Sequence, residues 1–151
     1  MSDDLTAITE VTRDLAYRQL DAQLQSSTSY DAKTIGVIAF DVAGVAGVLA
    51  AKDVFGKLWW VVILGLLIAS VAGLIALWSS QFDVGPDPGS FYENTKTDSL
   101  AQANIALVTE LTGSLQANDR ALRWKATAFL VALLVTIVTA AIAAVSLQAK
   151  P

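Results

Sequence analysis

Three long apolar runs, residues 35–51, 58–78 and 126–147, constrain this chain more than any other feature of its sequence. A helix needs about 20 mostly apolar residues to cross a hydrocarbon core of about 30 Å. Trp59 and Trp78 lie about 28 Å apart along a helix axis, which is the separation of the two aromatic belts of a bilayer. The first run is the shortest, and it contains Asp41. The runs predict an all-α membrane protein with three transmembrane helices.

The polar segments divide the chain into four parts. The sequence KDVFGK, residues 52–57, is a tight polar turn that would make the first two spans an antiparallel hairpin. Two prolines and two glycines in VGPDPGSF exclude a continuous helix across residues 79–98. The predicted parts are a cytoplasmic N-terminal helix (1–33), the transmembrane hairpin (34–80), a Pro/Gly linker (81–98) and a cytoplasmic helix continuous with the third span (99–151).

Helix signals place one amphipathic helix before the first span and another before the third. Residues 4–25 have helix-forming composition and an acidic first turn, and SSTSYD at 26–31 favours a cap or kink. Ser99 followed by Gln102 is typical of a capping box. No proline follows before the end of the third span, so residues 99–147 would form one rod of roughly 75 Å. Gly113 would weaken it by about 1 kcal/mol.

The distribution of lysine and arginine predicts an orientation. With three spans, the N-terminus and residues 79–125 share one side, which carries seven basic residues, against three on the other side. Because basic residues are enriched in cytoplasmic segments, we expect the N-terminus in the cytoplasm and the C-terminus outside.

The composition excludes most catalytic chemistry. The chain has no cysteine and no histidine, so thiol nucleophiles, imidazole bases and the usual zinc, copper or haem ligands are missing. We predict no catalytic residues, no metal, no cofactor and no enzymatic activity. The net charge of -4 argues against nucleic acid as a partner. The first 33 residues are polar and acidic, and do not show the basic stretch, apolar core and small-residue cleavage site of a cleavable signal peptide.

Asp41 is the most informative residue, because a carboxylate at membrane depth needs a partner or a water path. At equal depth the antiparallel second span places Ser70, which we predict as its neighbour, with Thr136 and Thr139 of the third span completing an intramembrane polar site. Three interpretations stay open. Asp41 is a hydrogen-bonded packing residue that keeps its proton, because burial disfavours the charged form; it lines or gates a path through an oligomer; or it pairs with a partner subunit.

Small residues lie along each predicted span. Glycines and alanines let helix backbones approach closely, and hydroxyl groups can bridge helices. We therefore predict a compact bundle in which Gly44 and Gly47 of the first span and Gly65 and Gly73 of the second mediate helix packing.

The polar helix over residues 99–125 can be read as coiled-coil heptads. An asparagine at a core position can fix the register and oligomeric state of a coiled coil. The alternative is an intramolecular seam packed on residues 4–25, which offer an approximate complement, and both arrangements can coexist in a homo-oligomer. The core positions are Leu100, Leu107, Ser114 and Ala121, then Asn104, Leu111 and Asn118, and the complement is Leu5, Ile8, Leu15 and Leu20.

Four arginines, Arg13, Arg18, Arg120 and Arg123, are the candidate anion-binding groups, because guanidinium forks match phosphate oxygens. The alternative is that they anchor the chain at the membrane interface or pair with local acids such as Asp14 and Asp119.

The layout then resembles a known family. A polar helix, YDAK entering a short first span, a tight hairpin, a second polar helix and LRWKATAFLVALL entering the last span resemble the Pycsar-type small transmembrane effector domain of bacterial antiphage defence, over most of residues 10–147. The resemblance implies a bacterial inner-membrane protein that responds to a cyclic pyrimidine nucleotide and then compromises the membrane. It carries over no ligand residue.

These features predict an oligomeric integral membrane effector that responds to a cytoplasmic signal, such as a cyclic nucleotide, and permeabilises the bilayer. The alternative is a structural accessory subunit of a larger membrane complex. The lipid bilayer is the expected partner in both cases.

Overall fold

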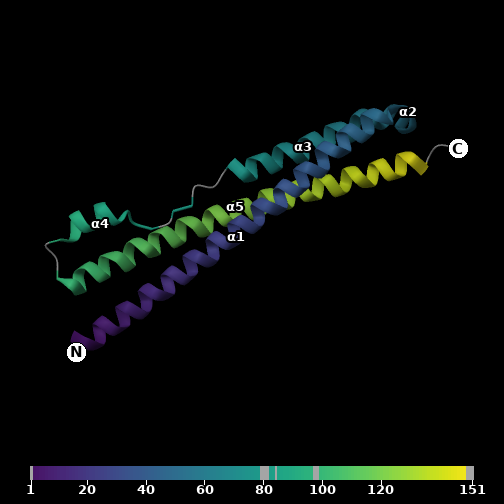
Figure 1. Ribbon diagram of the computed structural model, residues 1–151. Coiled ribbons are helices and arrows are strands. Elements are labelled where there is room, and N and C mark those ends of the chain that lie inside the picture. The colour runs from purple at the N-terminus through teal and green to yellow at the C-terminus, as the bar shows by residue number, and fades with distance from the viewer. Residues whose placement is uncertain (1, 79–81, 84, 97–98, 149–151) are drawn as a thin grey trace. The chain divides into compact units, whose positions relative to one another are not determined.

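The computed structural model describes residues 2–78, 82–83, 85–96 and 99–148, with side chains from residue 10 onward and residue 88 excepted. Every regular element in these ranges is helical, which confirms the all-α prediction (Figure 1). The elements in order are α1 (Ser2–Ala50), α2 (Lys52–Phe55), the 3-10 helix η1 (Gly56–Leu58), α3 (Trp59–Trp78), α4 (Pro88–Thr95) and α5 (Leu100–Gln148).

Three of these helical stretches are long and apolar enough to cross a membrane, as the sequence predicts. They are Glu10–Ala50, Lys52–Trp78 and Leu100–Gln148. By length and composition, the protein is suited to a membrane.

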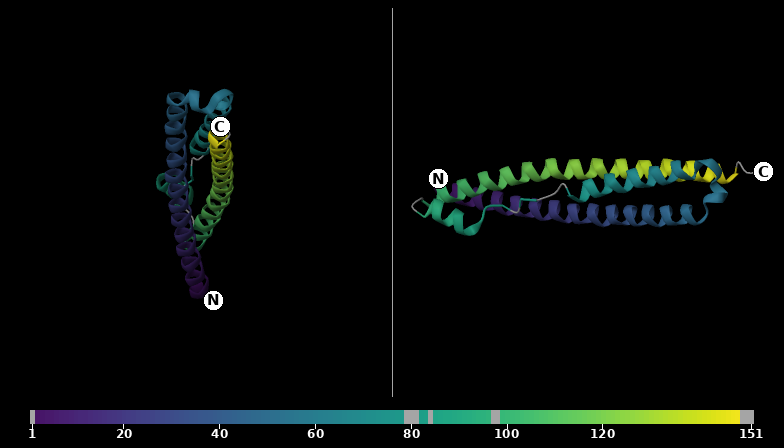
Figure 2. Two further views of the ribbon diagram at one scale, coloured as in Figure 1. Left: turned by 90° about the vertical axis from the view of Figure 1, so that its right-hand side faces the viewer. Right: turned by 90° about the horizontal axis from the view of Figure 1, so that it is seen from above.

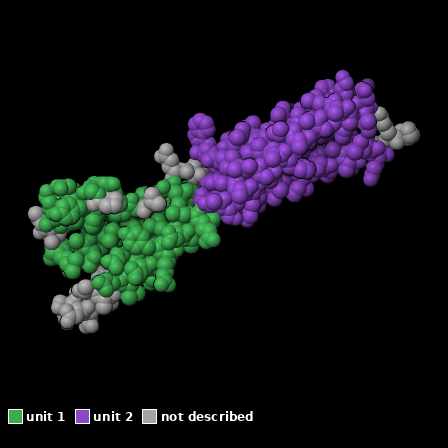
Figure 3. Space-filling view, viewed as in Figure 1, with its two compact units in different colours: residues 1–26, 81–122 green, residues 27–80, 123–151 purple. Residues whose placement is uncertain are grey.

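The chain divides into two compact units (Figure 3). Unit 1 comprises residues 1–26 and 81–122, and unit 2 comprises residues 27–80 and 123–151. Unit 1 contains α4, unit 2 contains α2, η1 and α3, and α1 and α5 contribute to both.

Unit 2 is a bundle of three helical segments, contributed by α1, α3 and α5 (Figures 1 and 2). Asp31 pairs with Lys125, and further along the chain Asp41 pairs with Thr136, so these parts of α1 and α5 run parallel. α3 runs antiparallel to them, because α2 and η1 reverse the chain between α1 and α3. This connection is helical, where the sequence predicts a tight turn. Gly56 at its centre has φ of 59°, a conformation that glycine adopts at little cost.

Of the cap or kink predicted at residues 26–31, the cap is wrong, because α1 continues through them without a helix end. Serine and threonine disfavour helix when their hydroxyls form hydrogen bonds with nearby backbone groups in place of the helical hydrogen bonds. Here Ser27 accepts a hydrogen bond from Lys125, 2.8 Å away, and Thr34 donates to the carbonyl of Tyr30 in the preceding turn at 2.7 Å. Both hydroxyls are satisfied without breaking the helix.

Three of the four predicted packing glycines lie at helix contacts in unit 2. A methyl group at Gly65 would overlap Thr139 of α5, and one at Gly73 would lie 2.8 Å from Ile38 Cγ1 of α1. A methyl group at Gly44 would lie 3.0 Å from the end of the flexible Leu66 side chain. Gly47 is different, because a methyl group there would meet no atom within 4 Å.

Unit 1 contains the intramolecular seam that the heptad pattern allows. Ala16 and Leu20 of α1 pack on Leu111 of α5, with Leu107 and Leu115 at the edges. Leu15, which the sequence places in this seam, is 55% exposed. Leu5 and Ile8 lie outside the described side chains. The coiled coil between chains stays a prediction.

Asn118 joins α5 to the linker within unit 1. Its side-chain oxygen accepts from the amide of Asp83 at 2.8 Å, and its side-chain amide donates to the carbonyl of Asp83 at 2.7 Å. Asn118 is 1% exposed. The heptad pattern places Asn118 in a coiled-coil core, but its side chain instead holds the backbone of Asp83 through two hydrogen bonds.

The linker contains α4, which the sequence analysis missed. Asp87 caps the helix, because its carboxylate accepts from the Ser90 amide at 2.9 Å and from the Ser90 hydroxyl at 2.7 Å. These bonds, of which the bond from the Ser90 backbone has the largest effect, lower the pKa of Asp87 below its ordinary value of 3.8.

The predicted capping box of α5 is confirmed. The backbone amide of Gln102 donates to Ser99 Oγ at 3.4 Å, and the backbone amide of Ser99 donates to Gln102 Oε1 at 3.1 Å.

Candidate functional site

The interior of unit 2 combines one apolar cluster, Val48, Val62 and Leu66, with many polar and small side chains, while many other large apolar side chains lie outside. Water-soluble proteins show the opposite arrangement. Phe40 on α1, Leu64 on α3 and Leu134 on α5 are each at least half exposed. The buried polar residues of the unit are Ser27, Thr34, Asp41, Ser70, Lys125, Thr136, Thr139 and Ser146. A bilayer in place of water around the bundle accounts for both observations.

Asp41 and Thr136 form a polar pair between α1 and α5. Asp41 is 0% exposed and Thr136 is 6% exposed. Thr136 Oγ1 lies 2.9 Å from Asp41 Oδ1 and 3.0 Å from the carbonyl oxygen of Ala132. The other carboxyl oxygen, Asp41 Oδ2, is buried with no hydrogen-bond partner in the described part of the chain.

Counting hydrogens limits the protonation states that fit this pair. A threonine hydroxyl has one hydrogen, so it can donate fully to Asp41 or to Ala132, but not to both. If Asp41 carries its proton on Oδ1, Asp41 donates to Thr136 and Thr136 donates to Ala132, so both contacts are hydrogen bonds. An unpaired buried oxygen is also less costly on a neutral carboxyl than on a carboxylate. The contacts therefore favour the neutral acid.

The other two residues of the predicted polar site do not bond to Asp41. Ser70 is 9% exposed on α3, but among the described residues the bond to Asp41 comes from Thr136. Thr139 is 4% exposed, and its side chain packs against Gly65 of α3. The depth argument that favours Ser70 considers the hairpin alone, whereas the actual partner comes from the third span.

A second polar cluster, at Lys125, was missed by the sequence analysis. Lys125 is 1% exposed. Its ammonium group donates to Ser27 Oγ at 2.8 Å and to Asp31 Oδ2 at 2.9 Å, and Asp31 Oδ1 lies 2.7 Å away. Lys33 precedes the first span as Lys125 precedes the third, yet Lys33 is exposed, and its ammonium group lies 5.6 Å from the ring centre of Tyr30.

The two clusters lie at different depths along the same helix pair. Asp31 and Asp41 are ten residues apart, a rise of about 15 Å, which is half the thickness of a hydrocarbon core of about 30 Å. If the lysine cluster lies at the membrane edge, the Asp41–Thr136 pair lies near the middle. The sequence did contain a signal for the lysine cluster, namely an acid and a lysine that each lie just before a span. Pairing them requires knowledge that α1 and α5 run parallel and in this register.

The predicted anion-binding arginines are surface residues. Arg13 Nη2 lies 3.5 Å from Oδ1 of its sequence neighbour Asp14. Arg18, Arg120 and Arg123 are exposed. Arg123 belongs to unit 2 and the other three to unit 1.

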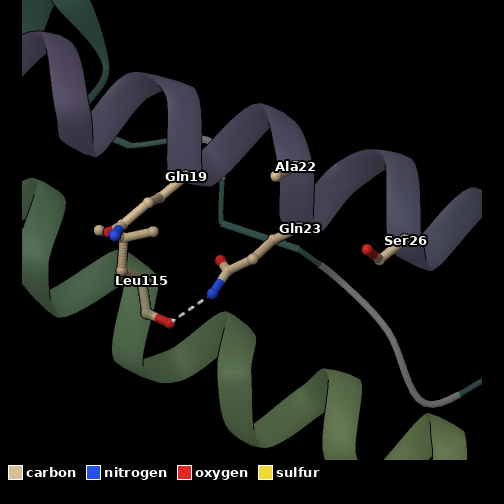
Figure 4. Close-up of a pocket in the computed structure, with 5 residues that line it drawn as sticks. All are labelled: Gln19, Ala22, Gln23, Ser26 and Leu115. Carbon is tan, nitrogen blue, oxygen red and sulfur yellow. Dashed lines mark hydrogen bonds between the residues drawn. The ribbon is translucent and has the colours of Figure 1, made fainter.

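Two hollows in the described part of unit 1 are lined by no lysine or arginine. One, of about 370 Å³, is lined by uncharged residues of α1 and α5, with Gln23 donating to the Leu115 carbonyl at 3.2 Å (Figure 4). The other is lined in part by the acids Asp83 and Glu110. Anion binding therefore stays a prediction. Among the described residues, no group of three or more Asp or Glu side chains is placed to hold a metal ion.

Comparison with known protein families, curated proteins and solved structures gives no match to this chain.

Proposed function

We propose that this protein is an oligomeric integral membrane effector whose three spans permeabilise the bilayer in response to a signal on the side of its N-terminus and α4. The observation that carries the proposal is the Asp41–Thr136 pair, an acid with one unpaired oxygen inside a bundle with an apolar exterior. Intramembrane acids are costly and most often belong to ion, proton or ligand pathways.

Hydration of the pair is the step we propose for permeabilisation. In the closed bundle Asp41 is fully buried and holds its proton. A rearrangement of α1 against α5 that admits water would hydrate Asp41 Oδ2 and lower the cost of ionising the carboxyl group. In an oligomer, several such hydrated sites would line a polar path.

Exposed apolar residues outside the three apolar runs at 35–51, 58–78 and 126–147 support self-association. Val11 and Leu15 of unit 1 lie four residues apart on one face of α1 and are 61% and 55% exposed. Such a stripe on a polar helix is suited to packing on another helix. We propose that a second copy covers it, and that the trigger is a cytoplasmic ligand, with a cyclic nucleotide as the first candidate because of the family resemblance.

The second candidate function is that of a structural accessory subunit. The same exposed stripe would then pack on a different membrane protein. Purification in mild detergent separates the two: a stable homo-oligomer supports the effector, and a monomer that is stable only beside other chains supports the accessory role.

Dye leakage from liposomes tests the effector proposal. The purified chain is reconstituted into liposomes with an entrapped dye, and leakage is followed with and without cyclic pyrimidine nucleotides. We expect nucleotide-dependent leakage that Asp41→Leu abolishes. No leakage under any condition from a homogeneous oligomer would contradict the proposal.

Two further variants test the role of the pair. Asp41→Asn keeps the hydrogen bond but removes the ionisable proton, so retained leakage would exclude ionisation as a required step. Ser146→Ala is the matched control, because Ser146 is also a buried hydroxyl of α5, but it donates to its own helix at Ile142. We expect this variant to leak like the wild type.

A further inference from the structure

We propose that a groove between α1 and α5 in unit 2 binds an anionic phospholipid of the surrounding bilayer, with an acyl chain along the groove and the phosphate at Lys33. The proposal rests on the membrane insertion in the proposed function, and not on permeabilisation.

The groove follows one face of each helix. On α1 its lining residues recur at i, i+3, i+4 and i+7 from Lys33 to Phe40, and on α5 with the same spacing from Leu133 to Ala140. It has a volume of about 440 Å³ and a length of about 10 Å, given 1.5 Å per residue. This face of α1 differs from the face that contacts Gly73 through Thr34 and Ile38. The groove therefore opens to the surroundings of the bundle and not to α3.

Gly36 keeps the groove open. A methyl group built on Gly36 would meet no atom within 4 Å, so the missing side chain leaves space that no neighbour fills. Phe40, one turn further on, is 60% exposed. A groove of this kind between parallel helices leaves apolar surface that lipid chains can cover.

The groove is lined by apolar residues over most of its length, which favours an apolar occupant. Its two polar residues are Lys33 at one end and Thr136 further in. The Thr136 hydroxyl is already engaged with Asp41 and the Ala132 carbonyl. An occupant beyond Lys33 therefore finds no free polar group to bind, which suits a hydrocarbon chain and not a polar ligand.

Lys33 gives the outer end of the groove an unbalanced positive charge. The neighbouring Asp31 is paired with Lys125, and in the described part of the chain Lys33 has no ion pair. Its ammonium group lies 5.6 Å from the Tyr30 ring centre. The rings of Tyr30 and Phe129 meet edge to face at 5.9 Å, one turn before the first lining residues of the two helices. The aromatic pair closes the space there, so a phosphate at this level would lie beside Lys33.

Photocrosslinking in nanodiscs tests the proposal on the full chain. Phosphatidylglycerol and phosphatidylcholine probes, each with a photoreactive acyl chain, are compared in equimolar bilayers, and adducts are mapped by mass spectrometry. We expect the phosphatidylglycerol probe to label residues 33–40 and 133–140 about fivefold more than the phosphatidylcholine probe, since one basic residue near an anionic lipid contributes about 1 kcal/mol. Lys33→Gln should remove this preference and keep the labelling by both probes.

Two glycine variants provide the matched comparison. Gly36→Leu fills the groove and should reduce labelling there to the level of the exposed face of α3 around Leu74. Gly47→Leu adds the same side chain where it also meets no atom within 4 Å, but outside the groove, and should change nothing. If Gly36→Leu does not fold, the Lys33→Gln comparison decides.

Three results would overturn the proposal. They are equal labelling by the two probes, groove labelling that survives Gly36→Leu, and efficient disulfide formation between copies carrying Phe40→Cys, which would identify a second copy as the occupant. Absence of dye leakage alone would contradict the proposed function and leave the lipid site intact.

Discussion

At the scale of single residues, the buried polar groups of unit 2 determine which substitutions are costly. The sequence placed Asp41 and Thr136 in one intramembrane polar site, but predicted Ser70 and not Thr136 as the neighbour of Asp41. Residue depth within the hairpin can be counted from the sequence, whereas the register of α5 against α1 depends on side-chain packing. The Lys125 cluster was missed for the same reason, although both charged residues precede a span.

The bond between Asp41 and Thr136 should be measurable by a double-mutant cycle. Thr136→Val keeps the side-chain shape and removes the hydroxyl, so we expect a loss of about 1 kcal/mol in the free energy of unfolding in detergent, which lies within the range for such bonds in membranes. In an Asp41→Leu background the same change should cost clearly less. Equal costs in both backgrounds would show that the two side chains are not coupled.

The two partners of the lysine cluster should respond unequally to substitution. The side chain of Lys125 is 2% exposed, and that of Asp31 is 37% exposed. Asp31→Asn removes the carboxylate that lies 2.7 Å from the buried ammonium and should cost about 2 kcal/mol, less than the loss of one partner of a fully buried pair. Lys125→Met leaves a carboxylate that solvent can reach, so it should cost less. Thermal unfolding of both variants measures the difference, and the reverse order would refute the assignment of the buried partner.

At the scale of helices, local signals predicted helix starts better than helix ends. The capping box at Ser99 needs only residues three apart and is present as expected. Of the cap or kink expected at residues 26–31, the cap is absent, and Ser27 there bonds to a lysine distant in sequence. The short helix α4 was not predicted because two prolines and two glycines lie within residues 85–89, although Pro88 at a first helical position is favourable.

Glycine contacts between helices give a matched prediction. Gly65→Ala forces a methyl group into Thr139 and should cost about 1–3 kcal/mol of unfolding free energy, the usual range for overpacking. Gly47→Ala meets no neighbour and should be neutral or gain up to about 1 kcal/mol, because alanine favours helix more than glycine does. Chemical unfolding in detergent compares them, and equal losses at both sites would contradict the packing of α3 on α5.

The cap of α4 should depend on pH in a defined direction. The pKa of Asp87 is lowered in the folded chain, so the ionised cap adds stability above its ordinary pKa of 3.8, and this contribution is lost as the pH falls through the lower folded value. The protection factor of the Ser90 amide, which compares its exchange rate with that of an unstructured chain at the same pH, should therefore fall below that pH. Asp87→Asn, which keeps a capping oxygen without a charge, should remove the pH dependence. A wild-type profile unchanged down to full protonation would contradict the cap.

At the scale of the whole molecule, the apolar runs were sufficient to predict an all-helical chain with three candidate spans, because length and hydropathy are local properties. The division into two units was not predictable from them, since it depends on which faces of α1 and α5 pack together. The heptad pattern likewise marked Leu107, Leu111 and Asn118 as inward-facing, but could not tell a coiled-coil contact from a clamp on the linker.

The three candidate spans predict that lipid surrounds unit 2 and that α2 and α4 lie on opposite sides of the membrane. The chain has no cysteine, so single cysteines at exposed positions can be labelled in sealed, oriented vesicles by a membrane-impermeant maleimide without background. We predict that Val54→Cys and Tyr92→Cys are labelled from opposite sides, and that Leu67→Cys is labelled from neither. Labelling of Val54→Cys and Tyr92→Cys from the same side, or ready labelling of Leu67→Cys from water, would contradict the account.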